Sequence, residues 1–240
     1  MPGRERSLVR SLASVYETLA ISWPTVLDAA LGRVEKDVCD ARLASWCKKV
    51  VQHTRMDITV RGKEHMKSGS TYLVMSNHQS HYDVPVLFYV LGANLRMITK
   101  VELFRIPIFG EAIRQAGFIA IDRSNRARAV ESLRVAKEKL AAGVHVWIAP
   151  EGTRSETGAL LPFKKGGFNV ALEAGLPVLP ISIQGTRDAL RAKDLRTAPG
   201  AKVKVTLGSP LHPSDYTQGD MRTRREALMA DVRRAIESGL

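Results

Sequence analysis

Apolar side chains recur at three- and four-residue intervals through residues 5–55, which is the spacing of an amphipathic helix. Pro24 interrupts the pattern, and we expect a kink or a break there because proline cannot complete the helical hydrogen bonding. Gly32 is the best candidate for the point where the chain turns back. The pattern therefore predicts a two-helix amphipathic hairpin with apolar positions Leu8, Leu12, Val15, Tyr16, Leu19, Trp23, Val26, Leu27, Ala30, Leu31, Val34, Val38, Trp46, Val50 and Val51.

This hairpin allows two interpretations. Its apolar side can pack on a main domain, as surface helices of globular proteins do. Alternatively, Trp23 and the leucines can lie in the headgroup region of a membrane, with basic residues such as Arg42, Lys48 and Arg55 directed at anionic lipid.

A different pattern begins after Met56, where short runs rich in β-branched residues alternate with helical segments. Strands are predicted at Ile58–Val60, Tyr72–Met75, Leu95–Thr99, Phe118–Ile121, Val144–Ala149, Val178–Ile183 and Val203–Leu207. Helices are predicted at Tyr82–Leu91, Arg126–Ala142, Gly166–Ala174 and Met221–Glu237. The alternation favours an α/β fold with a mixed, largely buried β-sheet flanked by helices. We expect the hairpin at 1–55 and one α/β domain at 56–240.

The charge balance indicates an anionic partner. Lysine and arginine number 36 against 24 acidic residues, which gives a formal charge of +12 over 240 residues. Nucleic acid, an acidic membrane surface and phosphorylated substrates all fit this charge. Only 6% of the residues are aromatic and no known nucleic-acid-binding motif is present, so we expect no nucleic acid, although a basic nucleic-acid-binding protein is the non-enzyme alternative.

Cysteine content and hydropathy bear on the compartment. Cys39 and Cys47 lie about 12 Å apart along one predicted helix, too far for a disulfide, so we interpret both as buried apolar residues in a reducing compartment. No stretch reaches the roughly 18 apolar residues of a spanning helix, and the N-terminus lacks the pattern of a secretory signal. We expect a protein that lies on a membrane if it meets one.

The first candidate site follows the strand at Tyr72–Met75. His78 and Asp83 are five residues apart, so on one continuous helix they would point about 140° away from each other. They can meet if His78 lies on the turn and Asp83 in the first helical turn. A carboxylate on one imidazole nitrogen leaves the other free to accept a proton. Asp83 could instead serve only the helix start, and His81 is a competing base.

Three further segments place charge or proline beside predicted strands. Asp122 and Arg123 end one strand, where Arg123 can hold a phosphate or pair with Asp122. The segment Pro150–Ser155 offers an acid, a glycine, a hydroxyl and a guanidinium, and reads as an anion site or as a charged turn. The run Leu176–Ile183 contains two prolines and can line an apolar slot or form an ordinary core strand.

In this order, the four segments resemble the motifs of the glycerolipid acyltransferase family, the 1-acylglycerol-3-phosphate O-acyltransferases. Asn77-His78 through Asp83 is similar to the first motif, Phe118–Arg123 to the second, Pro150–Ser155 to the third and Val178–Ile183 to the fourth. The resemblance covers roughly residues 56 to 190. Single motifs are weakly specific, whereas the ordered set is highly specific.

The resemblance implies a role for each matched residue. His78 would be the general base and Asp83 the residue that orients it. The phosphate-bearing acceptor would be bound by Lys100, Arg123, Glu151, Gly152, Thr153 and Arg154. Pro180 would belong to the wall of the acyl chain, and the N-terminal helices resemble the family's membrane-surface hairpin.

The implied reaction moves a fatty acyl group from an acyl thioester to the sn-2 hydroxyl of 1-acylglycerol-3-phosphate, giving phosphatidic acid. Imidazole titrates closest to neutral pH, which suits a general base, and the thiol leaving group needs no metal or other cofactor. The co-substrate would be acyl-CoA or acyl carrier protein, since both are anionic. We expect a peripheral, monotopic enzyme on the cytoplasmic face of an anionic membrane. The alternatives are acylation of another lysolipid, such as lyso-ornithine lipid, and a non-catalytic membrane-surface protein.

Overall fold

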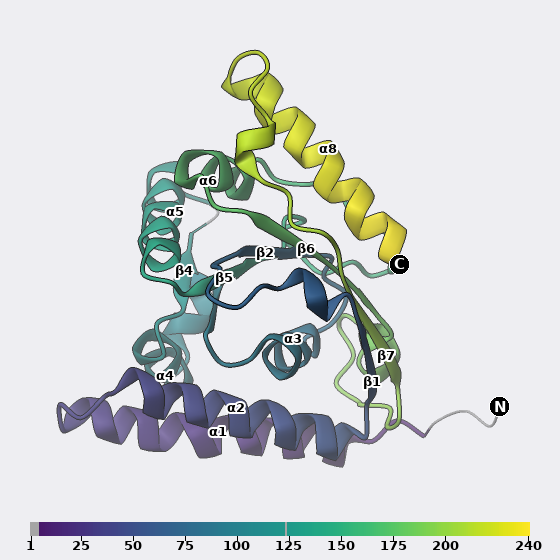
Figure 1. The fold of residues 1–240 in the computed structure, drawn as a ribbon. Coiled ribbons are helices and arrows are strands. Elements are labelled where there is room, and N and C mark those ends of the chain that lie inside the picture. Colours follow the sequence, from purple (N-terminus) through teal and green to yellow (C-terminus); the bar gives the residue numbers. More distant parts are fainter. Residues whose placement is uncertain (1–4, 123) are drawn as a thin grey trace.

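The computed structural model describes residues 5–122 and 124–240. In this part of the chain, seven strands form one sheet in the order β1-β7-β6-β2-β5-β3-β4 (Figure 1). All neighbours are parallel except β6 and β7, so the predicted mixed sheet is confirmed. The strands are β1 (Asp57–Arg61), β2 (Leu73–Ser76), β3 (Leu95–Lys100), β4 (Ile119–Ile121), β5 (His145–Ile148), β6 (Val178–Gln184) and β7 (Lys202–Leu207).

Helices cover both faces of the sheet. One face carries α3 and, outside it, the hairpin of α1 and α2, while α5, α6 and α8 lie on the other face (Figure 1). The helices are α1 (Leu8–Ala30), α2 (Lys36–Thr54), α3 (Asp83–Leu91), α4 (Phe109–Gln115), α5 (Arg126–Ala141), α6 (Gly166–Ala174), α7 (Thr186–Ala189) and α8 (Met221–Gly239). This arrangement buries both faces of the central strands, which is why they read as apolar runs in the sequence.

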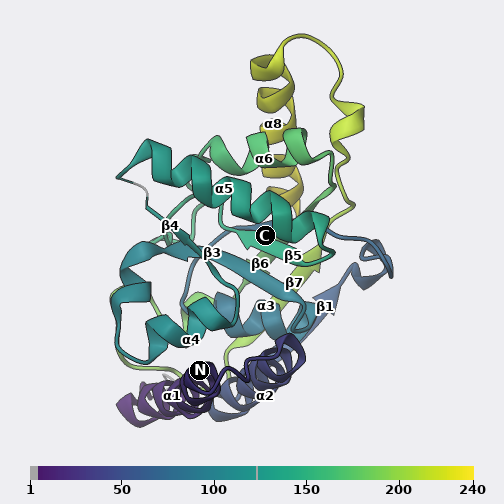
Figure 2. The ribbon, with the colours of Figure 1, turned by 90° about the vertical axis from the view of Figure 1, so that its left-hand side faces the viewer.

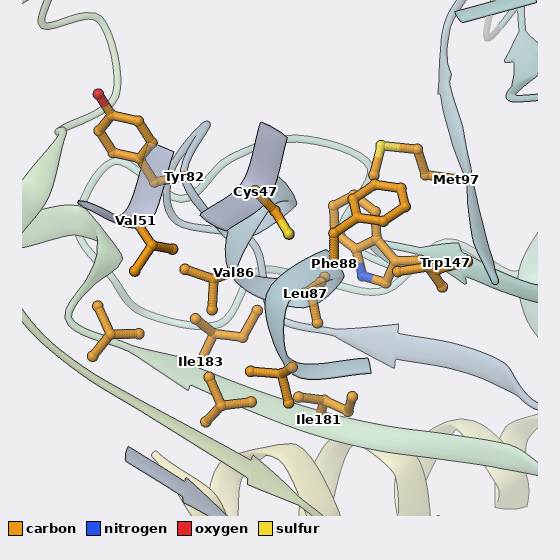
Figure 3. Close-up of a cluster of buried hydrophobic side chains, with 14 of the residues drawn as sticks. Cys47, Val51, Tyr82, Val86, Leu87, Phe88, Met97, Trp147, Ile181 and Ile183 are labelled. Carbon is orange, nitrogen blue, oxygen red and sulfur yellow. The ribbon is translucent and has the colours of Figure 1, made fainter. Parts of the chain in front are cut away.

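Alternation along the central strands divides the core in two. Val74, Trp147 and Leu179 point to the side of α3, where Cys47 and Phe88 also pack. The intervening residues, such as Leu73 and Met75, pack with α5, α6 and α8. Figure 3 shows the first of these clusters, in which α2, α3 and the sheet contribute side chains to one common core. The hairpin thus shares a hydrophobic core with the α/β domain.

The hairpin turns at Gly32, as predicted, where φ is +65°, a conformation that glycine adopts without steric cost. Pro24, where we expected a kink or a break, lies inside the continuous α1. Figure 2 shows α1 and α2 side by side below the rest of the domain. An ion pair of 2.5 Å between Arg96 on β3 and Asp40 on α2 ties the hairpin to the sheet.

Helix α1 buries its polar side and exposes its apolar side, the reverse of a surface helix in a globular protein. Its buried residues are Glu17, Ser22 and Thr25, and the two hydroxyls donate to carbonyls one helical turn earlier, which satisfies them without water. Most of its large apolar side chains face outward, whereas Ile21 packs against the core. The exposed apolar residues of the hairpin are Leu8, Val9, Leu12, Val15, Tyr16, Leu19, Trp23, Leu27, Leu31 and Val38. No helix within 5–122 and 124–240 is long and apolar enough to cross a membrane.

The predicted seven strands and the four predicted helices after Met56 are all present. Helix α4 was missed, because it is only seven residues long and Gly110 weakens the helical pattern. The structure explains this glycine. A Cβ at Gly110 would lie 2.3 Å from the carbonyl oxygen of Phe104, so only glycine lets α4 approach the preceding turn so closely.

Candidate active site

The candidate residues gather at one edge of the sheet. Strands β2, β3, β5 and β6 are parallel, so their carboxyl ends meet at the same edge. His78 lies two residues after β2, Lys100 ends β3 and Glu151 lies three residues after β5. Open α/β sheets bind ligands at this edge, because loops from several strands converge there. The parallel register thus brings together residues that are more than 70 positions apart in the chain.

His78 and Asp83 are in direct contact. His78 lies on the turn after β2, and Asp83 is the first residue of α3. The turn between them brings the two side chains together although they are five residues apart. Nδ1 of His78 lies 2.7 Å from Oδ2 of Asp83. An ionised carboxylate only accepts hydrogen bonds, so Nδ1 carries the proton and Nε2 is left as the acceptor. The imidazole also packs edge-on against Trp147, with ring centroids 5.5 Å apart.

The carboxylate of Asp83 is completely buried and fully hydrogen-bonded. Oδ2 also accepts the backbone N–H groups of Gln79 and Ser80, at 2.7 and 2.9 Å. Oδ1 accepts the hydroxyl of Thr186, the first residue of α7, at 2.5 Å. These donors compensate for the cost of burying a charge and leave the carboxylate one orientation toward His78.

The backbone of His78 is held by Glu151. The two oxygens of this buried carboxylate accept N–H groups of His78 and Leu161, at 2.7 and 2.8 Å. Burial raises the pKa of Glu151 above its usual value, although both hydrogen bonds act in the opposite direction. The carboxylate of Glu151 therefore supports the backbone of His78. Its predicted part in binding the acceptor stays a prediction.

Asn77 fixes the same loop to the sheet. Its side chain donates to the carbonyl of Ile183 and accepts the N–H of the same residue, both at 2.8 Å. This paired contact continues the pairing of β2 with β6 beyond the end of β2. The loop that carries His78 is consequently held from both neighbouring strands, by Glu151 after β5 and by Ile183 in β6.

A cavity of about 710 Å³, which we call the anion cavity, opens in front of His78. The predicted residues Lys100, Gly152, Thr153 and Arg154 line it, together with Lys164. Among the described residues, neither a hydrogen-bond acceptor nor an acid partner is found for the side chains of Lys100, Arg154 and Lys164. Three cations around one cavity without a counter-charge are suited to hold a phosphate group.

Two predicted site residues are placed elsewhere. Arg123 lies outside the described residues, although β4, which precedes it, also ends at this edge of the sheet. Pro180 is a buried residue of β6, opposite Met75 of β2, and lines neither the anion cavity nor the two cavities, of about 210 and 470 Å³, that lie against α1. Its predicted place beside the acyl chain stays a prediction.

A second cavity, which we call the apolar cavity, lies between the hairpin and the sheet. Its volume is about 210 Å³, and α1, α2, β3 and α4 supply most of its walls. It shares five lining residues with the anion cavity, so the two are adjoining spaces. The shared residues are His81, Val84, Met97, Thr99 and Leu103.

His81, the competing base, has different surroundings from His78. Desolvation and the nearby positive charge of Arg154 lower the pKa of His81, so its ring is neutral at neutral pH. Within the described residues its side chain has no hydrogen-bonded carboxylate. The geometry that orients an imidazole for proton transfer is therefore present at His78 and absent at His81.

The sequence patterns assigned no individual role to Thr186, Asn77 or Lys164. Thr186 offered one signal, since Gly185-Thr186 follows a buried strand at the same point where the other strands carry their site residues. The glycine is required there, because φ is +86° and a Cβ would lie 1.9 Å from the carbonyl oxygen of Lys202.

Comparison with known proteins gives consistent results. A family model described as Acyltransferase matches residues 57–184. The chain is 36% identical over 162 residues to 1-acyl-sn-glycerol-3-phosphate acyltransferase of Cocos nucifera, covering 67% of this chain and 52% of that protein. It is also 36% identical over 181 residues to the alpha form from Mus musculus, covering 75% and 62%. The chain thus spans about half to three-fifths of the length of these two relatives.

The fold is shared with a solved structure. The crystal structure of the 1-acyl-sn-glycerophosphate acyltransferase PlsC from Thermotoga maritima matches with a TM-score of 0.78 and 28% identity, covering 97% of this chain and 95% of that one. The family match spans the segment from β1 to the end of β6, which contains His78, Asp83 and the anion cavity. The ordered motifs, the fold and these matches together establish that the chain belongs to the acyltransferase family.

Proposed function

We propose that the protein transfers a fatty acyl group from an acyl thioester to the sn-2 hydroxyl of 1-acylglycerol-3-phosphate, giving phosphatidic acid. The observation that carries this proposal is the contact between His78 and Asp83 at the entrance of a cavity with three unpaired cations among the described residues. Relatives named for this activity, at up to 36% identity, support the same reaction.

His78 acts as the general base in this proposal. Its Nε2 takes the proton of the acceptor hydroxyl while the hydroxyl oxygen attacks the thioester carbonyl. The C–O bond forms, the C–S bond breaks, and the imidazolium returns its proton to the leaving thiolate. Asp83 stabilises the imidazolium, and Glu151 keeps the His78 backbone in place. General-base catalysis of this kind contributes about 10²- to 10⁴-fold.

Lys100, Arg154 and Lys164 bind the phosphate of the acceptor or of a coenzyme A donor in the anion cavity, and Thr153 adds a hydroxyl. The second motif's Arg123 adds a further cation in this proposal. The apolar cavity receives the acyl chain of the donor, because it adjoins the anion cavity and its walls are chiefly apolar. A chain placed there ends with its thioester near His78.

We further propose that residues 1–55 form a membrane-surface unit and 56–240 the catalytic domain. The outward apolar side of α1 supports this, since ten exposed large apolar residues on the hairpin exceed what a soluble surface helix presents. The formal charge of +12 favours an anionic membrane, and a peripheral, monotopic attachment at its cytoplasmic face is consistent with an acyl thioester donor.

The test measures free thiol release by the purified protein on anionic vesicles that contain 1-acylglycerol-3-phosphate. Palmitoyl-CoA and palmitoyl-acyl carrier protein are supplied in parallel, and His78→Ala is compared with His81→Ala. We expect release that needs the acceptor and falls by at least about 10²-fold in His78→Ala but far less in His81→Ala.

Each other outcome has a definite meaning. Undiminished release by His78→Ala would refute the proposed base. Turnover of lyso-ornithine lipid without turnover of 1-acylglycerol-3-phosphate would replace the acceptor by the alternative lysolipid. An inactive protein that shifts mixed oligonucleotides in a salt-sensitive manner would favour the nucleic-acid-binding alternative.

A further inference from the structure

A third cavity, which we call the side groove, lies along the same inner face of α1 as the apolar cavity, nearer the N-terminal end of the helix. Its volume is about 470 Å³. One wall comes from α1 and α2, and the opposite wall from the segment 190–195, which follows α7. Its lining residues are Ser11, Ser14, Val15, Thr18, Trp46, Val50, His81, Tyr82, Pro85, Arg154, Leu190, Lys193, Asp194 and Leu195.

The three cavities meet at His81, which lines each of them. Arg154 lines both the anion cavity and the side groove, so a cation stands at the inner end of the groove. Thr18 and Trp46 line both the side groove and the apolar cavity, and the indole N–H of Trp46 donates to the hydroxyl of Thr18 at 3.0 Å. This linked pair lies at the boundary between the two cavities.

The opposite end of the side groove reaches the exposed apolar surface of the hairpin. Val15 and Leu195 are 54% and 74% exposed, and they stand on opposite walls of the groove. The wall formed by residues 190–195 is held firmly, because Arg6 pairs with Asp194 at 2.8 Å and Ser7 bridges to Thr197. The groove is thus continuous with the surface through which, in the proposed function, the protein contacts lipid.

The reaction proposed above brings two acyl chains to one histidine, one on the thioester and one already on the lysolipid. We propose that the side groove holds the acyl chain of the acceptor lysolipid, while the apolar cavity holds that of the donor; this inference rests on the proposed function. A lysolipid in the groove places its phosphate at Arg154 and its glycerol beside His81, next to the anion cavity. Its chain extends outward between Val15 and Leu195.

The position of Arg154 decides which acyl chain is assigned to which cavity. A lysolipid joins phosphate, glycerol and chain within one short molecule, so its chain must begin beside a phosphate site. Arg154 gives the side groove such a site, whereas the apolar cavity adjoins the anion cavity through His81, Val84, Met97, Thr99 and Leu103, which include no permanent charge. A thioester carbonyl is uncharged, and it therefore suits the uncharged passage between the apolar cavity and the anion cavity.

The test uses Val15→Trp, which fills the side groove from α1. Tyr16→Trp is its matched control, since Tyr16 is the next residue of the same helix, is 68% exposed and lines none of the three cavities. Both variants add an indole to the membrane-facing helix. Ala112→Leu, which narrows the apolar cavity, is the counterpart on the donor side. Acceptors with an oleoyl and with a hexanoyl chain, and donors of several chain lengths, are compared in mixed micelles.

For Val15→Trp we expect the ratio of kcat/KM for the oleoyl acceptor to that for the hexanoyl acceptor to fall about tenfold, which corresponds to roughly two methylene groups denied burial. The donor chain-length profile stays as in the wild type. Tyr16→Trp keeps the wild-type ratio, and Ala112→Leu changes the donor profile and not the acceptor ratio.

Equal ratios for Val15→Trp and Tyr16→Trp, with wild-type circular dichroism for both, would overturn the inference. A changed donor profile in Val15→Trp would assign the groove to the donor chain and overturn it equally. Either of these two outcomes can be observed only if the wild-type protein acylates a lysolipid. A wild type that acylates no lysolipid of either chain length would instead refute the proposed function itself.

Discussion

Thr186 provides a sharp test of how the site is held together, because among the described residues its side chain hydrogen-bonds only to Asp83. Thr186→Val keeps the size and branching of the side chain and replaces the hydroxyl by a methyl group. The hydroxyl and the carboxylate are both completely buried and are separated by 2.5 Å. The substitution leaves Oδ1 of Asp83 without a donor, while Oδ2 retains its three donors.

The magnitude follows from the charge on the acceptor. A hydrogen bond to a charged group contributes about 1.5–3 kcal/mol, and an unsatisfied buried acceptor costs a similar amount. The carboxylate can recover part of this loss by rotating, which turns Oδ2 away from Nδ1 of His78. Because the imidazole must be oriented when it takes the proton, we expect kcat to fall about 10- to 100-fold while KM changes less than about twofold.

The assay is acceptor-dependent thiol release, with the unfolding transition followed by circular dichroism. Thr186→Ser restores the hydroxyl and should recover most of kcat. Thr54→Val is the matched control, since Thr54 is also completely buried, but its hydroxyl only donates to carbonyls of α2. A kcat for Thr186→Val within about twofold of the wild type, or equal losses in both valine variants, would refute a positioning role for Thr186.

Two further predictions concern buried groups. Glu151→Gln replaces one of the two accepting oxygens by an NH₂ group, which then faces the N–H of His78 or Leu161. We therefore expect kcat to fall about tenfold or more with little change in KM. A rise in KM alone would instead indicate that Glu151 binds the acceptor. Burial lowers the pKa of His145, whose Nδ1 accepts the N–H of Tyr72 at 3.1 Å. Its contribution to stability is complete above the unfolded pKa of about 6.5 and is lost as the pH falls toward the lower folded pKa. Between about pH 7.5 and about pH 5, the free energy of unfolding in urea should therefore fall more for the wild type than for His145→Gln. An equal fall in both proteins would contradict this role of His145.

Local sequence patterns were enough to locate the helices and strands and the chemical groups that they carry. β-branched runs and helical periodicity are local properties, so each strand after Met56 was predicted close to its observed position, and Gly32 marked the turn of the hairpin. The chemical residues were also readable, because they follow strands and parallel strands end at one edge of the sheet. His78 and Asp83 are only five residues apart, so their meeting needed nothing more than a turn followed by a helix.

Contacts between distant segments could be seen only in the folded chain. The periodicity of α1 predicts an apolar stripe but not the direction in which it faces, and packing alone shows that its polar side is the buried one. Glu151 reads as one more charge beside an arginine until the register of β2 and β5 brings it behind His78. Thr186 lies 103 residues from Asp83 and has no motif of its own, and cavities belong to no single segment. Such features depend on which strands become neighbours, which local sequence patterns do not encode.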